Sequence, residues 1–250
     1  LCRKQTIVRH LNKNGELIIA KLEKYKTEFG NNQNQLVLVQ DITESYTRQQ
    51  EVELTYDIST ILKENTSIHQ SLEKALQKIR TITGWDLIEL WSPVYDHSFI
   101  RNNISASNDQ HPQVSVINKF IEQTRLNQYS QYQYSQVPAY KNQKPHWIES
   151  LTDDDSLVRK VIAKEAGFKS ILAVPILNDG VIVCSLYLFS FQEKKRNENA
   201  EKLIQTLGSL IGIELVKRKR ELELDLLFKI SPEVLTIAGM NGRYLKVNPA

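Results

Sequence analysis

The chain has 250 residues, of which 41% are hydrophobic and 24% charged, which suits one or two globular domains of roughly 100–150 residues each. Its 32 basic and 29 acidic residues leave a net charge of +3, and no basic stretch is interleaved with aromatic residues, which argues against nucleic-acid binding. The two cysteines, Cys2 and Cys184, lack the spacing of a disulfide framework or a zinc site.

The composition also bears on where the protein works. No uninterrupted run of about 18 apolar residues occurs, so we expect no membrane span, and the N-terminus lacks the apolar core of a signal peptide. Together with the low cysteine content, this favours a cytoplasmic protein. The chain starts at Leu1 rather than Met and stops just after the strand-like Tyr244–Val247, so we expect both ends to be cut from a longer protein.

Residues 6–43 show a pattern of three strands separated by two turns. Asn12-Lys13-Asn14-Gly15 marks the first turn and Gly30-Asn31-Asn32 the second, and Leu36–Val39 reads as a buried strand. Three strands with one apolar face bury little surface. We therefore expect this sheet to be the back part of a larger domain.

A helix is predicted to follow this sheet. Asp41 and Thr43 have short polar side chains that can bond the backbone where a strand turns into a helix, so we expect a stiff junction there. Residues 45–57 are polar and compatible with a linker helix that leads into Ile58 and Ile61.

The middle of the chain alternates helical and strand patterns. Residues 68–83 carry apolar side chains at helical spacing and end at a capping Gly84, and a strand is predicted over Trp85–Trp91. A second strand, a short helix over Asn118–Arg125 and a Tyr-rich loop over Gln128–Tyr140 follow.

A short strand at Trp147-Ile148 precedes a capped helix. Asp153-Asp154-Asp155-Ser156 suits the N-terminus of a helix over Leu157–Ala166, with Gly167 just past its end. The three carboxylates are better explained as a cap than as a calcium site, because no further oxygen ligand has the required spacing.

A β-hairpin and a long helix come next. Ile171–Leu177 and Val181–Phe191 flank Asn178-Asp179-Gly180, which favours a tight hairpin turn. After a polar break, apolar residues recur on one helical face at Leu203, Ile204, Leu207, Leu210, Ile211 and Leu215. These patterns predict an α+β fold with a mainly antiparallel sheet, with the hairpin at its closing edge.

Residues 58–216 resemble a GAF domain of bacterial signalling proteins. The resemblance rests on PHWIESLTDDDSLVRKVIAKEAGFKSILAVPILNDGVIVCSLYLFS followed by EKLIQTLGSLIGIEL, where a WI strand, a capped helix, Ala-Gly, a Val-Pro-Ile strand and a turn occur in the family's order. The Tyr-rich loop departs from it, because relatives often have a short Gly-rich turn there. The resemblance implies an antiparallel GAF-like sheet with flanking helices.

Both flanks resemble parts of PAS domains. KNGELIIAKLEKY and LVLVQDITES look like the last strands of one PAS domain, and LLFKISPEVLTIAGMNGRYLKVNPA like the opening strands of another. The expected order is PAS strands over 1–44, a linker helix over 45–57, the GAF domain, a second linker helix over 217–227, and the start of a PAS domain over 228–250.

The PAS, GAF, PAS order resembles the input half of bacterial sensor histidine kinases in two-component phosphorelays and of diguanylate cyclases or phosphodiesterases. The chain shows no His-box, ATP-binding boxes or GGDEF string, so we expect no catalysis by this segment. The leading interpretation is a sensory input module followed in the same chain by a transmitter. A GAF receptor for a small molecule, such as a cyclic nucleotide, is the alternative, although the cyclic-nucleotide signature is not convincing.

Candidate binding residues are few. The histidines are not spaced as metal ligands, so no metal site is expected; they are His10, His69, His97, His111 and His146. The cofactor stays unknown, and no covalent bilin is expected because Cys184 has no neighbouring His. Trp91, Trp147 and Cys184 are the candidates for a GAF ligand pocket, and packing in the core is the competing explanation for each.

The helices are expected to carry the signal. We expect a homodimer through Ser45–Ile61 and Leu203–Leu227, with an apolar stripe that includes Leu222 and Leu226 and is interrupted by Arg218 and Asp225. Lys217-Arg218-Lys219-Arg220 is expected to be a solvated face with i, i+4 ion pairs. The residues proposed to couple the signal are Asp41, Thr43, Leu207, Ile211 and Leu215.

Overall fold

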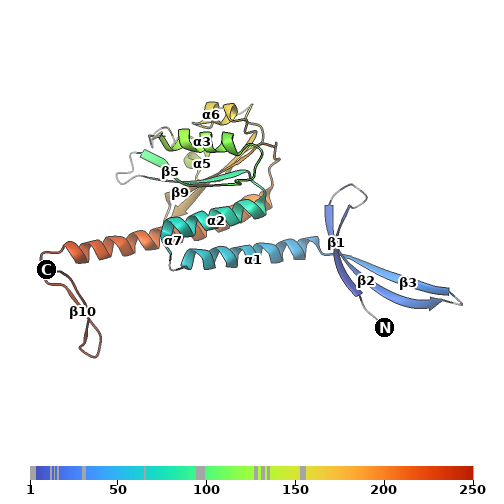
Figure 1. Ribbon diagram of the computed structural model, residues 1–250, viewed down its shortest axis with the longest axis horizontal. Coiled ribbons are helices and arrows are strands. Elements are labelled where there is room, and N and C mark those ends of the chain that lie inside the picture. The colour runs from blue at the N-terminus through green and yellow to red at the C-terminus, as the bar shows by residue number, and fades with distance from the viewer. Residues whose placement is uncertain are drawn as a thin grey trace. The chain divides into compact units, whose positions relative to one another are not determined.

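The computed structural model divides into two compact units, Leu1–Asp57 and Ile58–Ala250 (Figure 1). It describes residues 4–249 apart from 12, 14, 16, 30, 31, 65, 94–98, 127, 128, 131, 132, 134, 135 and 153–155. The predicted turn residues Asn12, Asn14, Gly30 and Asn31 and the triple Asp therefore lie outside the described residues.

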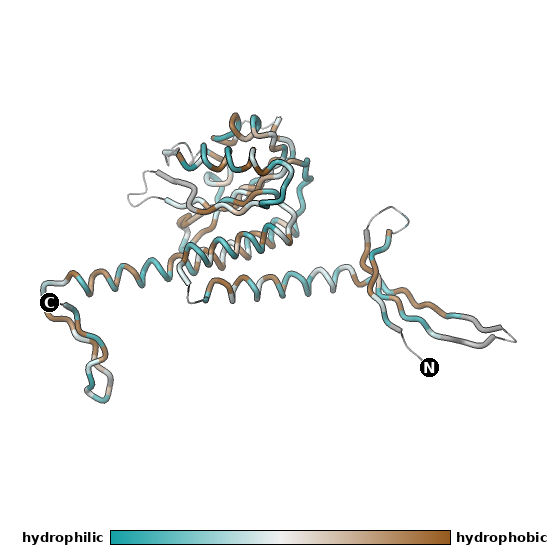
Figure 2. The backbone as a smooth tube through the Cα atoms, viewed as in Figure 1, coloured by the Kyte–Doolittle hydropathy of each residue, from teal (hydrophilic) through white to brown (hydrophobic). Residues whose placement is uncertain are grey.

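The first unit contains a three-stranded antiparallel sheet in the order β1 (Lys4–Leu11), β2 (Leu17–Phe29) and β3 (Asn32–Asp41). Leu36, Val37, Leu38 and Val39 of β3 are all exposed, so this strand, expected to be buried, is not. The physical reason is that three strands supply too few side chains to cover both faces. Figure 2 shows brown, apolar stretches along this sheet.

The sheet passes into helix α1 (Thr43–Lys63) through a bonded junction. The Thr43 hydroxyl oxygen accepts a hydrogen bond from the Ile19 amide at 2.8 Å, and Asp41 Oδ1 accepts from the Thr43 amide at 2.9 Å and the Thr43 hydroxyl at 2.6 Å. These two bonds from Thr43 lower the pKa of Asp41. The helix begins two residues before the expected 45 and continues past 57, from the first unit into the second.

The second unit contains a six-stranded sheet in which every pair of neighbouring strands is antiparallel, in the order β6-β5-β4-β9-β8-β7. This confirms the expected mixed fold with an antiparallel sheet. The strands are β4 (Leu87–Pro93), β5 (Phe99–Ser107), β6 (Tyr129–Ser130), β7 (His146–Ile148), β8 (Ser170–Asn178) and β9 (Val181–Ser190).

The β8–β9 hairpin turns at Asp179 and Gly180, which both have positive φ, 50° and 77°, as a two-residue hairpin turn requires. Its expected place at the closing edge of the sheet is wrong, because β9 lies between β4 and β8. Residues 184–190 are all buried, and a strand buried on both faces and mostly apolar is typical of a sheet centre rather than an edge.

Helices cover both faces of this sheet (Figure 1). Helices α2 (Ile68–Thr83) and α7 (Glu198–Ile230) pack on one face. The core of the other face joins β4, β8 and β9 to α3 (Val114–Leu126), α5 (Pro138–Asn142) and α6 (Lys160–Glu165). The predicted cap of α2 is present, since Gly84 adopts a left-handed conformation and its amide donates to the Arg80 carbonyl.

Three predicted segments differ in extent. Helix α3 begins four residues before the expected start. The stretch expected to be a loop contains β6 and the start of α5, which Pro138 helps to begin. The helix expected over Leu157–Ala166 is shorter, because α6 begins only at Lys160. Arg159 precedes it and makes no capping side-chain bond, since its side chain turns into the core.

The C-terminal region continues α7 beyond the expected linker, to Ile230. A hairpin of β10 (Thr236–Ala238) and β11 (Tyr244–Val247) follows. Asn248 ties it to the end of the helix, because its side chain donates to the Ser231 and Glu233 carbonyls and accepts from the Leu235 amide.

Two glycines let α7 approach the sheet closely. A Cβ atom at Gly212 would lie 2.6 Å from Ile176 Cγ2, and one at Gly208 would overlap Ile176 Cδ1. Ile176 is itself buried, so it has little room to move away. The backbone of α7 therefore lies directly on the side chain of Ile176.

We expect Gly208→Ala to destabilise the protein, because overpacking costs about 1–3 kcal/mol against a gain of about 1 kcal/mol in helix propensity. In an Ile176→Val background, which lacks Cδ1, the same substitution should become neutral or stabilising. Urea unfolding of the four proteins measures this coupling. Equal effects of Gly208→Ala in both backgrounds would contradict the close contact.

Candidate functional site

A buried ion pair lies at the centre of the sheet face covered by α3, α5 and α6. Arg159 Nη1 donates to Glu89 Oε2 at 2.7 Å, and both side chains are completely shielded from solvent. Glu89 comes from the middle of β4, whereas Arg159 immediately precedes α6. Removing two charges from water is costly, so each requires the other.

Aromatic rings surround the Arg159 guanidinium. Its central carbon lies 4.3 Å from the ring centre of Trp91 and 5.2–5.5 Å from three further rings, those of Phe120, Tyr187 and Phe189. The Trp91 indole Nε1 donates to Glu89 Oε2 at 3.0 Å. The rings therefore stabilise the cation through their faces, while the indole and the arginine both bond the same carboxylate oxygen.

Strand register brings this cluster together. Residues directly opposite each other on paired strands share a face, and Glu89 lies opposite Tyr187 while Leu87 lies opposite Phe189. Helix α3 adds Phe120 and Thr124, whose hydroxyl oxygen is 3.4 Å from Arg159 Nη1. Sequence reasoning missed this cluster, although a single carboxylate inside the apolar run of β4 was a usable signal that a buried cation lay nearby.

The structure separates the three ligand-pocket candidates. Trp91 belongs to the cluster around Arg159, and its ring lies 5.7 Å from that of Tyr129. Trp147 pairs with Leu172, while its neighbour Ile148 pairs with Ile171 of the cluster face, so Trp147 lies on the opposite face. Its indole donates to the Lys194 carbonyl at 2.8 Å.

Cys184 also lies on that opposite face. It pairs with Ile176, which contacts α7, and burial raises the pKa of its thiol to about 12. Trp91, Trp147 and Cys184 therefore do not line one common cavity, and only Trp91 lies on the face of the buried cation. Because β9 is largely apolar on both faces, its sequence pattern does not show which face Cys184 occupies.

The proposed coupling residues of α7 also occupy two environments. Leu207 and Ile211 are fully buried within one copy of the chain, so they are unavailable as the seam of a coiled coil between copies. Leu215 is half-buried and, with Val181 and Val183, lines a groove of about 470 Å³ rimmed by Lys219 and Arg220. A signalling role for these residues remains a proposal.

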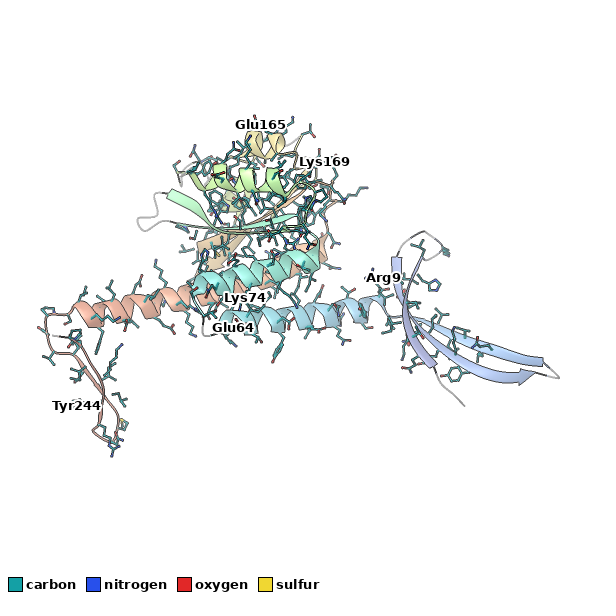
Figure 3. The ribbon with its side chains drawn as sticks, viewed as in Figure 1. Arg9, Glu64, Lys74, Glu165, Lys169 and Tyr244 are labelled. Atoms are coloured by element: carbon teal, nitrogen blue, oxygen red, sulfur yellow. The ribbon has the colours of Figure 1, made fainter. Side chains whose placement is uncertain are left out.

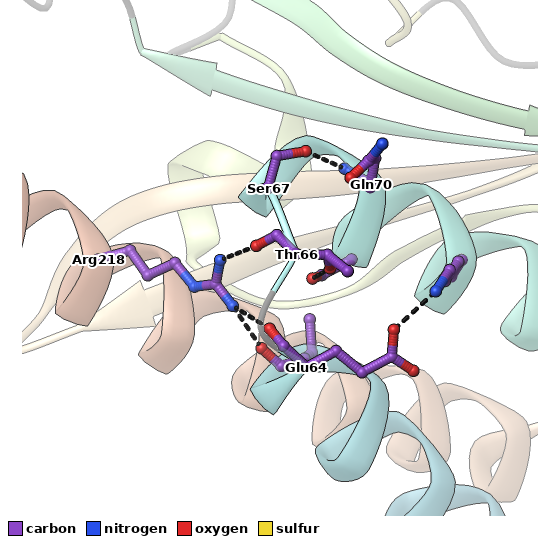
Figure 4. A network of polar contacts seen from close by, with 8 residues as sticks. Glu64, Thr66, Ser67, Gln70 and Arg218 are labelled. Carbon is purple, nitrogen blue, oxygen red and sulfur yellow. Dashed lines mark hydrogen bonds and ion pairs between the residues drawn. The ribbon is translucent and has the colours of Figure 1, made fainter.

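Arg218 differs from the expected solvated face. Its side chain is only 20% exposed, and it turns toward the turn between α1 and α2 (Figure 4). The neighbouring Lys217 and Lys219 are exposed, each 3.9 Å from a glutamate four residues later, as expected. Figure 3 shows Glu64 and Lys74 near this turn.

Neither a metal centre nor a membrane span is evident within the described part of the chain. No group of three or more His, Cys, Asp or Glu side chains there could hold a metal ion. Among the same residues, no helix is both long and apolar enough to cross a bilayer.

A six-stranded antiparallel sheet with helices on both faces, and a buried charged cluster under the shorter helices, is the architecture of a small α+β domain. The family model described as GAF domain matches residues 65–216, more than half of the chain. The chain therefore belongs to the GAF domain family, as the sequence resemblance indicated.

Solved structures show the same fold. The GAF domain of a phosphoenolpyruvate-protein phosphotransferase from Coxiella burnetii has a TM-score of 0.56 at 11% identity, over 70% of this chain and 98% of that one. Free methionine-R-sulfoxide reductase from Neisseria meningitidis, solved with its substrate, has a TM-score of 0.54 at 9% identity, over 70% and 93% of the two chains.

A domain of a putative two-component sensor histidine kinase from Sinorhizobium meliloti has a TM-score of 0.50 at 11% identity. The match covers 64% of this chain and 99% of that domain. The comparison with curated proteins gives no match. At such low identities the likeness concerns the fold alone.

We expect Arg159→Ala to lower the free energy of unfolding by about 3–5 kcal/mol, because it leaves the Glu89 carboxylate buried without its cation. The double variant Glu89→Leu/Arg159→Met should recover most of this loss, since it removes both charges. Lys164→Ala, at an exposed position of α6, is the control and should change stability by less than about 0.5 kcal/mol.

Urea unfolding monitored by circular dichroism measures all three variants. A loss for Arg159→Ala no larger than that of the control would contradict the buried pair.

Proposed function

We propose that this chain is a non-catalytic sensory input module of a bacterial signal-transduction protein, with a sensor histidine kinase as the parent. Its GAF domain passes a change of state to a downstream transmitter through helices that pair between two copies of the chain. The partial PAS domains proposed at 1–44 and 228–250 add further input on either side.

The continuity of α7 is the observation that carries this proposal. One helix of 33 residues begins on the sheet of the GAF domain and continues far past its last buried residue, Glu214. A helix packed on the core at one end and exposed at the other can transmit a shift or rotation from the core, because packed helices move as rigid elements.

The exposed part of α7 carries the surface proposed for pairing. Leu222, Leu226 and Ile230 are 67%, 53% and 65% exposed and recur every four residues, which places them along one side of the helix. Exposed apolar residues at helical spacing are what a partner helix covers. This seam lies beyond Leu207 and Ile211, which the sheet already covers.

The Sinorhizobium domain, which has this fold and comes from a putative two-component sensor histidine kinase, supports a kinase as the parent. A diguanylate cyclase or phosphodiesterase with the same input order is the alternative parent. A His-box followed by an ATPase domain in the coding sequence of the parent distinguishes the kinase from a cyclase with a GGDEF string.

We expect the wild-type chain to have the mass of a dimer in light scattering, and Leu222→Glu/Leu226→Glu to shift it to the monomer. The dimer loses about 1.5–3 kcal/mol of burial free energy for each leucine replaced in each copy, and the new carboxylates repel each other across the seam. Val161→Glu, at an exposed apolar position of α6, is the matched control and should stay dimeric. A monomeric wild type at high concentration, or a dimeric double variant, contradicts helix pairing.

A second candidate function is a receptor for a small molecule on the face of Trp91. The observation in its favour is the aromatic cluster with one ion pair at its centre, since ligand sites are mostly apolar with few polar groups. A ligand bound there would contact α3 and α6 and bias the sheet on which α7 lies.

This receptor function, in its cyclic-nucleotide form, predicts that cGMP or cAMP raises the melting temperature. At a hundred times its Kd, a ligand adds about 2.7 kcal/mol of stability, a shift of roughly 5–10 °C for a chain of this size. Linear GMP and AMP are the controls. No shift with either cyclic nucleotide would exclude this form of the receptor.

A further inference from the structure

The last turn of α1 and the residues just after it present three backbone carbonyls to a single side chain of α7. The last carbonyl groups of a helix have no partner within the helix. Arg218 Nη2 donates to the Leu62 carbonyl at 2.9 Å and to the Glu64 carbonyl at 3.2 Å, and Nη1 donates to the Thr66 carbonyl at 2.8 Å (Figure 4). A cation at this place also suits the partial negative charge of the helix end.

The guanidinium is held in this orientation from its own helix. Glu214, one turn before Arg218, accepts a hydrogen bond from Arg218 Nε at 2.8 Å, and its side chain is only 11% exposed. The three guanidinium nitrogens of Arg218 thus contact three carbonyls and one carboxylate. A lysine has one nitrogen and cannot span these acceptors, so the site is specific for the planar arginine fork.

The same turn is fixed to α2 from its other side. Glu64 forms an ion pair with Lys74 of α2 at 2.6 Å, and the Thr66 hydroxyl lies 2.8 Å from that of Ser71. The Ser67 hydroxyl accepts from the Gln70 amide and so caps the start of α2. The turn between α1 and α2 is therefore bonded to both helices that cover this face of the sheet.

We propose that Arg218 is a clasp that makes the end of α1 and the emerging part of α7 move as one body, with a closed state in which the three carbonyls are bound and an open state in which they are released. The six residues that follow Arg218 in α7, 219–224, are all exposed, so the clasp lies where the part of the helix that packs on the domain ends. This inference rests on the proposed transmission through α7, and it names the contact that performs it.

The test loosens α1 and measures the response of α7. Lys63→Gly weakens the last turn of α1 at an exposed residue, without altering any side chain of the clasp. We expect Lys63→Gly to speed amide hydrogen exchange over residues 214–222 of α7 severalfold in the wild-type background. In an Arg218→Lys background the same substitution should leave exchange in 214–222 unchanged.

Arg218→Lys alone should speed amide exchange of residues 62–70 by about tenfold to a hundredfold. This factor corresponds to the free energy that a hydrogen bond to a charged group usually contributes. Lys217→Ala, one residue earlier and exposed, is the matched control and should leave 62–70 unchanged. Unchanged exchange in β8 and β9 verifies that each variant is folded.

Two results would overturn the clasp. One is that Lys63→Gly changes the amide exchange of residues 214–222 equally with arginine and with lysine at position 218, or changes it in neither background. The other is unchanged exchange of 62–70 in Arg218→Lys. Light scattering on the same samples separates this inference from the proposed function, because a monomer that still shows the arginine-dependent coupling retains the clasp and loses helix pairing.

Discussion

The contact of α7 with Ile176 sets the rotation of that helix, and the features farther along it depend on this rotation. Gly208 and Gly212 remove the two side chains that would hold the helix away from β8. Eleven residues make about three helical turns, so Arg218 projects from the same side of α7 as the buried Leu207. The side of α7 that packs on the sheet is apolar. Farther along the same side, where the helix meets the end of α1 instead of the sheet, it carries the cation Arg218.

Two arginines of this domain bind two different kinds of polar group that are shielded from water. Arg159 neutralises a carboxylate inside the sheet and is surrounded by rings, whereas Arg218 satisfies backbone carbonyls at a helix end. A buried ion pair adds little stability relative to an apolar core, but it admits few alternative arrangements. We interpret the Glu89–Arg159 pair as the contact that fixes the start of α6 over the middle of the sheet.

Much of the fold was predictable because its signals are local. Asp179-Gly180 between apolar runs predicts the hairpin and Gly84 predicts the end of α2. The resemblance to the family rests on short motifs in sequence, from Trp147-Ile148 to the Val174-Pro175-Ile176 strand. The site was not predictable to the same degree, because it depends on which face of a strand each side chain occupies. Strand β9 is largely apolar on both faces, so its sequence does not reveal that Cys184 and Trp91 lie on opposite sides of the sheet. The sequence around Arg218 indicates a solvated charge run, because its acceptors are carbonyls some 150 residues earlier, which no side-chain pattern reveals.

The exposed strand β3 has a consequence for how the protein behaves at high concentration. Within the described part of the first unit β3 pairs only with β2, and Gln35–Gln40 contains four consecutive apolar residues and no charge. An uncharged edge strand offers its free backbone groups to any extended segment that meets it. Natural sheets usually protect such an edge with a lysine, a proline or a bulge. Gln35–Gln40 contains no lysine and no proline. Strand β3 is therefore open to strand addition, a route of self-association that needs no helix at all.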